Sequence, residues 1–182
     1  EIDHLVFYGA SWTGSAVQWL TQWPVTTECA GVFTPRLRDK MFVHYYNHLP
    51  LARRLASDAD VEWGGPNTLG NVVTELKARG ARGGRIGLLG PLGHEGFGTL
   101  KSAFGKIVSL GKDYVQLRKV KSKEELDWFR IGAWMSDCGM QAMADHARPG
   151  VSEHELANAI ERAYVGNGGQ HVIHFIGTTP MA

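Results

Sequence analysis

Apolar residues recur at helical spacing through positions 126–144, and this pattern predicts the longest element of the chain. The residues in its two rows are Leu126, Phe129, Ala133, Met140 and Ala144, then Ile131, Met135, Cys138 and Ala142. Ser122 and Glu125 have the spacing of a capping box, in which each side chain bonds the other residue's backbone amide. Pro149 and Gly150 stop a helix. We expect a helix over about 123–147 whose apolar stripe is buried in the assembled protein.

The same pattern repeats directly afterwards. Ser152 and Glu155 form a second capping box, and the sequence predicts a helix over 153–165. The residues of its apolar face are Leu156, Ala159, Ile160, Ala163 and Tyr164. The run 166–169 ends this helix with residues that tolerate positive φ. The apolar, β-rich segment 171–177, HVIHFIG, then predicts a buried strand.

Positions 1–117 alternate between short apolar runs and amphipathic segments. The predicted strands cover 5–9, 29–34, 40–46, 61–63, 85–90, 107–108 and 114–117. The predicted helices cover 15–23, 49–56, 67–80 and a segment through 100–104. The second and third strands have the spacing of a hairpin. Alternation of this kind predicts an α/β domain in which helices cover a sheet.

The motifs of the second half resemble one enzyme family. The run RKVKSKEEL, a long helix, RPGVSEHELA, a second helix and GNGG together resemble the opening of the pita-bread metallohydrolase domain. That domain is shared by Xaa-Pro aminopeptidases, prolidases and creatinases. The resemblance covers 117–177, and the preceding part is similar, more weakly, to the creatinase-type N-terminal domain. The fold class that this implies is α/β over 1–117, followed over 118–182 by the opening helices and strand of an incomplete pita-bread α+β domain.

The resemblance implies a hydrolase as the parent protein. The expected function is the N-terminal part of a Xaa-Pro aminopeptidase or prolidase-like metallopeptidase that aids oligomerisation and shapes the active-site rim. The alternatives are part of a creatinase-like C–N hydrolase that needs no metals, or a non-catalytic dimerisation module. The family pattern also implies a homodimer, a peptide or small-molecule substrate, and a pair of divalent metals, Mn, Co or Zn, in a full-length peptidase.

Composition excludes several other classes. The chain has 182 residues, 43% hydrophobic and 20% charged, as soluble globular proteins do. Its net charge of +1 gives no electrostatic case for nucleic acid or a membrane surface. No apolar run approaches membrane-spanning length, and the first residues have no secretion-signal pattern. The two cysteines, Cys29 and Cys138, are interpreted as buried free thiols. This usage favours a cytoplasmic protein.

Candidate catalytic chemistry is sparse in these residues. His171 and His174 lie three apart in a predicted strand, so they point to opposite faces and do not share a metal. The family's two-metal site uses two Asp, one His and two Glu, and none of those motifs occurs here. The segment GHEGFG fits neither the P-loop nor the dinucleotide spacing, and is interpreted as a strand-to-helix loop. We therefore expect no catalytic and no metal-binding residue in this chain.

Aromatic residues gather in the first third of the chain. They are Trp12, Trp19, Trp23, Tyr45, Tyr46 and Trp63. These side chains fit a core, but Trp and Tyr are also favoured anchors of buried interfaces. The family habit of packing this domain against a partner's active site points to the run His44–His48. The residues expected at the substrate or interface rim are therefore His44, Tyr45, Tyr46 and His174.

Overall fold

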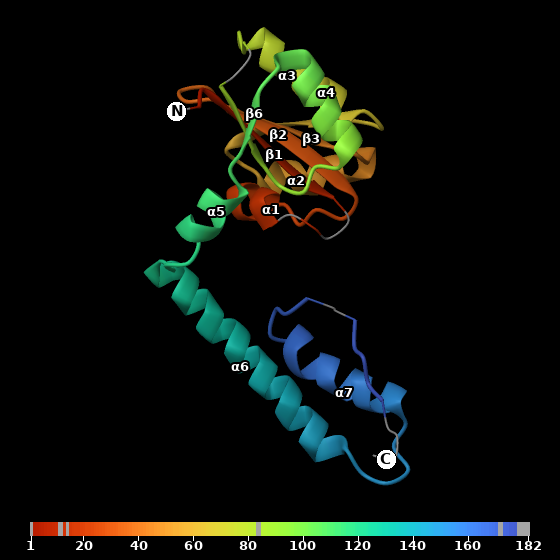
Figure 1. The fold of residues 1–182 in the computed structure, drawn as a ribbon. Helices are drawn as coiled ribbons and strands as arrows, with labels where there is room; N and C mark the ends of the chain where they lie inside the picture. The colour runs from red at the N-terminus through yellow and green to blue at the C-terminus, as the bar shows by residue number, and fades with distance from the viewer. Residues whose placement is uncertain (1, 11–12, 14, 83–84, 171–172, 178–182) are drawn as a thin grey trace. The chain divides into compact units, whose positions relative to one another are not determined.

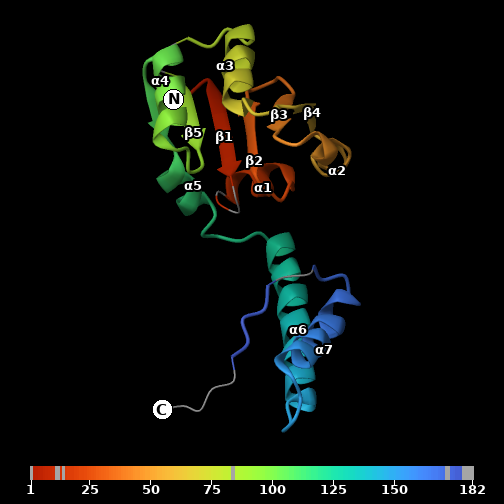
Figure 2. The same cartoon turned by 90° about the vertical axis from the view of Figure 1, so that its right-hand side faces the viewer.

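The computed structural model describes residues 2–10, 13, 15–82, 85–170 and 173–177. The chain divides into two compact units, Glu1–Lys119 (unit 1) and Val120–Ala182 (unit 2). Unit 1 holds the sheet and unit 2 holds two helices, as the ribbons in Figures 1 and 2 show. No helix among the described residues combines the length and apolar character that a membrane-spanning helix needs.

Unit 1 is built on a six-stranded sheet with the order β4-β3-β2-β1-β5-β6. Its strands are β1 (His4–Ala10), β2 (Glu28–Phe33), β3 (Asp39–Val43), β4 (Ala59–Trp63), β5 (Ile86–Leu89) and β6 (Ile107–Ser109). The β1–β2 and β2–β3 pairs are antiparallel, and the other pairs are parallel. The predicted pairing of the second and third strands is thus confirmed. The carboxyl ends of five strands and the amino end of β2 therefore share one edge of the sheet, called here the carboxyl edge.

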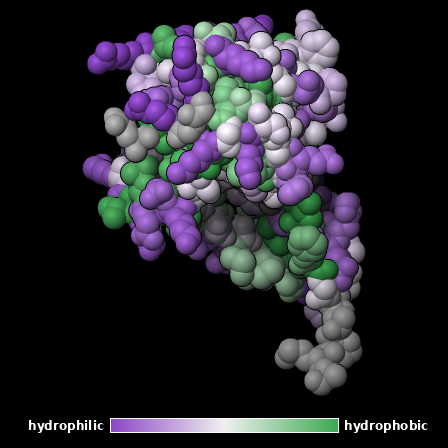
Figure 3. Space-filling model, turned by 45° about the horizontal axis from the view of Figure 1, so that its top comes forward, coloured by the Kyte–Doolittle hydropathy of each residue, from purple (hydrophilic) through white to green (hydrophobic). Residues whose placement is uncertain are grey.

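Helices cover both faces of this sheet, which confirms the predicted α/β class. The helices of unit 1 are α1 (Ser15–Thr21), α2 (Leu49–Leu55), α3 (Thr68–Ala78), α4 (His94–Phe104) and α5 (Gly111–Leu117). One buried cluster joins α1 and α2 to Phe7, Met41 and Val43. The other joins α3 and α4 to Val6 and Ile86. Figure 1 shows α3 and α4 together over one face. On the face seen in Figure 3, hydrophilic residues make up much of the surface of unit 1.

Strict alternation along the strands explains the two cores. Val6 and Tyr8 of β1, Ala30 of β2 and Phe42 of β3 pack toward α3 and α4. Phe7, Cys29, Met41 and Val43, which alternate with these residues, pack toward α1 and α2. The reason is that successive strand side chains point to opposite faces. The two clusters together make unit 1 a closed three-layer body.

One predicted strand of unit 1 is wrong. Residues 114–117 belong to helix α5, not to a strand. Tyr114 contacts the ring of Trp19 edge-on, and its hydroxyl lies 3.1 Å from the Ser15 hydroxyl. The guanidinium of Arg118 lies over both rings. These contacts bring α5 against α1, and such tertiary packing outweighs the β propensity of the local sequence.

Unit 2 contains the long helix α6 (Lys123–His146) and α7 (Glu153–Val165). Both predicted capping boxes are confirmed. The Glu125 amide donates to the Ser122 hydroxyl at 3.1 Å, and the Ser122 amide donates to the Glu125 carboxylate at 2.9 Å. Ser152 and Glu155 repeat this arrangement at the start of α7. The two helices pack against each other.

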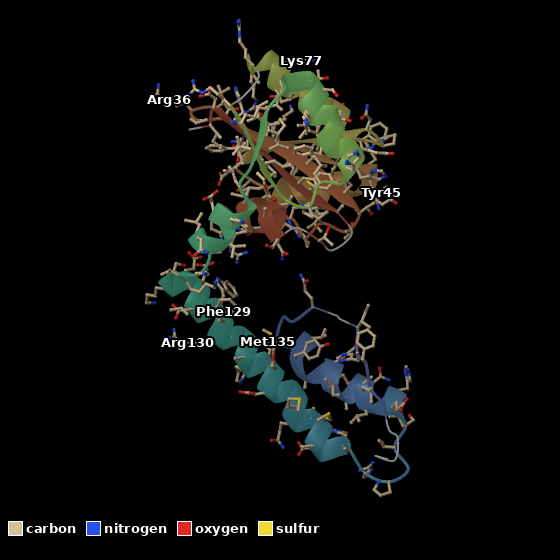
Figure 4. The ribbon with its side chains drawn as sticks, in the orientation of Figure 1. Arg36, Tyr45, Lys77, Phe129, Arg130 and Met135 are labelled. Carbon is tan, nitrogen blue, oxygen red and sulfur yellow. The ribbon has the colours of Figure 1, made fainter. Side chains whose placement is uncertain are left out.

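One further prediction for this half is wrong within the described residues. Segment 173–177 forms no strand, and Phe175 is 95% exposed, so the predicted buried strand is wrong there. His171 and Val172 lie outside the described residues. Burial of the α6 stripe in the assembled protein stays a prediction. Within unit 2, Leu126 and Phe129 are 42% and 57% exposed, while Met135, Cys138 and Ala142 are partly buried. Figure 4 shows Phe129 and Met135 projecting from α6.

Candidate functional site

The run His44–His48 begins where β3 ends at the carboxyl edge. It passes through a single turn of 3-10 helix, Tyr46–His48, into α2. The His48 amide donates to the Tyr45 carbonyl at 3.1 Å, which closes this turn. We call residues 44–48 the aromatic turn. Figure 4 shows Tyr45 at the margin of unit 1.

Three backbone carbonyls fasten the aromatic turn to the neighbouring strands. The His44 amide donates to the Glu28 carbonyl at 3.2 Å, and the Gly64 amide donates to the Val43 carbonyl at 2.8 Å. The Trp63 indole N–H donates to the His44 carbonyl at 3.0 Å. Because Trp63 ends β4 and Glu28 begins β2, the turn is held from both sides.

Aromatic rings pack edge-to-face through the turn. Tyr45 contacts the rings of His44 and His48, with centroids 4.7 and 5.3 Å apart. Tyr46 contacts Trp63 at 5.9 Å with perpendicular planes. Such pairs stabilise by about 0.5–1.5 kcal/mol beyond their buried area. Tyr45, Tyr46 and Trp63 still expose 47%, 70% and 55% of their surface, so their outer parts can contact another molecule.

Behind the turn lies a chain of three polar side chains. The Tyr8 hydroxyl donates to Oε1 of Glu28 at 3.1 Å. Oε2 of the same carboxylate lies 3.6 Å from Nδ1 of His44. Burial, followed by the charge and hydrogen bond of Glu28, raises the pKa of Tyr8 to about 12. Burial also raises the pKa of the neighbouring Cys29 thiol, with a smaller effect from Glu28. Both groups therefore stay protonated at neutral pH.

His174, the fourth predicted site residue, belongs to unit 2. Its Nε2 atom lies 3.0 Å from the Tyr164 hydroxyl and 3.2 Å from Oε1 of Glu161. Both partners are on α7, so these contacts hold segment 173–177 along that helix. The structure therefore brings His44, Tyr45 and Tyr46 together, while His174 is described with its own unit.

The site roles of Glu28, Tyr8 and the Trp63 indole were not predicted from the sequence. A signal for Glu28 was present, because a carboxylate directly precedes an apolar strand and has to sit at its end. The Tyr8 and Trp63 contacts depend on strand order and register. Among the described residues, no group of three or more His, Cys, Asp or Glu side chains could hold a metal ion.

Solved structures that share this fold include an X-Pro aminopeptidase, a Xaa-Pro dipeptidase and a prolidase. An X-Pro aminopeptidase from Thermotoga maritima is 15% identical, with a TM-score of 0.77, over 92% of this chain and 46% of that chain. A Xaa-Pro dipeptidase from Bacillus anthracis is 16% identical, with a TM-score of 0.67, over 91% of this chain and 45% of that chain. A prolidase from Pyrococcus horikoshii is 15% identical, with a TM-score of 0.67, over 91% of this chain and 45% of that chain. No family model and no curated protein matches the chain.

Identities at this level show a shared fold. The chain spans about half the length of these solved structures. The expected fold, a creatinase-type N-terminal domain followed by the start of a pita-bread domain, is that of the matched part of these enzymes.

Proposed function

We propose that this chain is the N-terminal part of a Xaa-Pro aminopeptidase or prolidase-like metallohydrolase. In this proposal unit 1 supports oligomerisation and shapes the active-site rim, and catalysis depends on residues outside these 182. The observation that carries the proposal is the fold shared over 91–92% of this chain with three proline-directed peptidases. The motifs RKVKSKEEL and RPGVSEHELA, which led to the same family, support it independently.

The unburied apolar side of unit 2 supports the view that this unit is part of a larger domain. Among its described residues, Leu156 is the one apolar side chain that is buried. The α6 side chains left exposed are Leu126, Trp128, Phe129, Ile131, Trp134 and Met140. Apolar surface of this extent on a single helix is covered by protein in stable domains. The proposal assigns that covering role to the remainder of a pita-bread domain.

The metal pair of such an enzyme does not fit the residues described here. A two-metal hydrolytic site needs several carboxylates and a His around both ions. The described residues offer no such group, so we assign no ligand and no catalytic step to them. The proposal places the Mn, Co or Zn pair in the rest of the protein. Cys29 and Cys138 are free thiols, which supports the cytoplasmic location that the proposal includes.

Metal content and turnover test the enzymatic part of the proposal. The 182-residue chain and a version extended to the length of the matched peptidases are dialysed with Mn²⁺ or Co²⁺ and assayed on a Xaa-Pro dipeptide. We expect two metals per subunit and turnover in the extended protein alone. Stoichiometric metal and turnover by the 182-residue chain would overturn the assignment. Metal-free hydrolysis of a small amidine by the extended protein would favour the creatinase-like alternative.

The aromatic turn is the part of unit 1 that we propose as the rim and dimer contact. Tyr45, Tyr46 and Trp63 form a cluster of partly exposed aromatic rings held on a rigid strand edge. Aromatic anchors of this kind dominate many interfaces and lose little side-chain entropy on binding. We propose a homodimer in which this turn approaches the partner's substrate site, and we also propose His174 as a residue of the substrate rim.

A pair of matched variants tests the dimer. Tyr46→Ser removes an exposed ring from the aromatic turn, and Leu37→Ser removes an exposed apolar side chain, 52% accessible, from the turn between β2 and β3. We expect light scattering at micromolar concentration to show a dimer for wild type and Leu37→Ser, and a shift toward monomer for Tyr46→Ser. A wild-type monomer, or a dimer unaffected by Tyr46→Ser, would contradict the role of this turn.

A further inference from the structure

Three side chains from three strands converge behind the aromatic turn. Tyr8 lies in β1, Glu28 begins β2, and His44 follows β3. The register pairs Tyr8 with Ala30 and Ala10 with Glu28, and it pairs Ala30 with Phe42. Alternation along the strands then places the side chains of Tyr8, Glu28 and His44 on one face of the sheet. They are at its carboxyl edge, where the aromatic turn begins.

The contact between His44 and Glu28 is incomplete. Nδ1 of His44 is buried and makes no hydrogen bond within the described residues, and it lies 3.6 Å from Oε2 of Glu28. If this nitrogen carries a lone pair, it faces the lone pairs of a carboxylate. If it carries the proton of a neutral ring, the distance exceeds that of a hydrogen bond. A protonated imidazole would instead form a charge-assisted bond, for which about 2.7–2.9 Å is typical.

We infer that His44 and Glu28 form a pH-sensitive latch on the aromatic turn. Protonation of His44 closes the contact with Glu28 and holds the turn more firmly against β2. Deprotonation releases the ring and leaves the turn held by its backbone bonds and by Trp63. This inference adds a regulatory property to the proposed rim, but the latch itself depends only on contacts within unit 1.

Other titratable groups near His44 have separate partners. The Tyr8 hydroxyl donates to Glu28, and its high pKa keeps it protonated throughout the relevant range. On α3, which packs against β2 and β3, Glu75 and Arg79 form an ion pair with each other. Within the turn, His48 contacts Tyr45 and Trp23 through its ring. His48 is therefore the group whose titration has to be separated from that of His44.

The indole of Trp63 reports on the latch directly, because its N–H donates to the His44 carbonyl. In ¹⁵N-labelled protein, the Trp63 indole signal is followed from pH 4.5 to 8.5, with Trp63→Phe used for assignment. We expect the signal to shift in a single transition within this pH range. The carbon resonances of the His44 ring should give the same midpoint.

Four variants decide the assignment. His44→Gln and Glu28→Gln should abolish the transition, while His48→Gln should keep it. Tyr8→Phe, which leaves the Glu28 charge in place, should also keep it, and His44→Gln decides the assignment if Glu28→Gln does not fold. A Trp63 signal that is constant with pH, or a transition that survives in His44→Gln, would overturn the latch. No measurement here uses activity or oligomeric state, so its failure is distinct from failure of the proposed function.

Discussion

Unfolding at alkaline pH should depend on the buried phenol of Tyr8. Its pKa is raised from 10.0 to about 12, chiefly by burial and then by Glu28. Below pH 10 the folded and unfolded states both keep the proton. Above pH 10 the unfolded chain loses it first, so the free energy of unfolding falls as pH rises and levels off above pH 12.

The size of this loss follows from the shift. Two pKa units correspond to about 2.7 kcal/mol at the end of the transition, since one unit is about 1.36 kcal/mol. By pH 11 about 1.4 kcal/mol of this has been lost. Tyr8→Phe removes the titrating group and also a hydrogen bond to a charged acceptor. At pH 8 the variant should therefore be less stable by about 1.5–3 kcal/mol.

Urea unfolding followed by tryptophan fluorescence at pH 8, 9.5 and 11 tests this reasoning. The stability gap between wild type and Tyr8→Phe should narrow by about 1.4 kcal/mol between pH 8 and 11. Cys29, whose pKa burial also raises, lowers stability with rising pH in both proteins. Cys29→Ala in each background removes that contribution. Glu28→Gln should weaken the pH dependence of stability only in part, because burial is the larger cause of the raised Tyr8 pKa. A gap that stays constant with pH would refute the argument.

Four further variants probe other parts of the chain. Ser122→Ala and Ser152→Ala should each lower the free energy of unfolding by about 0.5–2 kcal/mol, and unchanged urea midpoints would show that the caps contribute nothing. Gly31→Ala should cost about 1–3 kcal/mol by overpacking, because a Cβ there would overlap the buried Phe7 ring and lie 2.7 Å from the Lys40 carbonyl oxygen. A thermal melt that matches wild type would contradict this close approach. Phe129→Ala should change the stability of the 182-residue chain by less than about 0.5 kcal/mol but cost about 3–5 kcal/mol in an extended protein that buries this ring. Equal effects in the two proteins would show that the rest of the protein does not cover α6.

Local signals were sufficient for the helices of unit 2 and for most strands of unit 1. A Ser followed three residues later by Glu fixes where α6 and α7 begin, because the cap is made within one turn. Segment 114–117 could not be predicted in this way. Its aromatic and β-branched residues favour a strand, but the contacts of Tyr114 with Trp19 and Ser15 come from residues about a hundred positions away.

The candidate site also combines residues that the local sequence reveals with residues that only long-range strand pairing brings in. His44, Tyr45 and Tyr46 were predicted as site residues from the sequence, although the predicted strand 40–46 included them and β3 ends at Val43. Glu28 and Tyr8 become part of the site only through the antiparallel register of β1, β2 and β3. The Trp63 indole reaches His44 through the parallel pairing of β3 with β4. Long-range register, and not residue type, therefore limited the prediction.

The two units differ in how far each one buries its own apolar side chains. Unit 1 buries fully the large side chains of Phe7, Met41 and Leu76, on both faces of its sheet. It can therefore hold the aromatic turn in a fixed geometry. Unit 2 has well-formed caps but a single buried apolar side chain among its described residues, so helix propensity and capping are its main local support. An isolated helix pair of this kind is marginal in water, because most helix stability comes from packing an apolar face. The periodicity of α6 thus identifies a face that needs a partner layer, and the proposed function assigns that layer to the rest of a pita-bread domain.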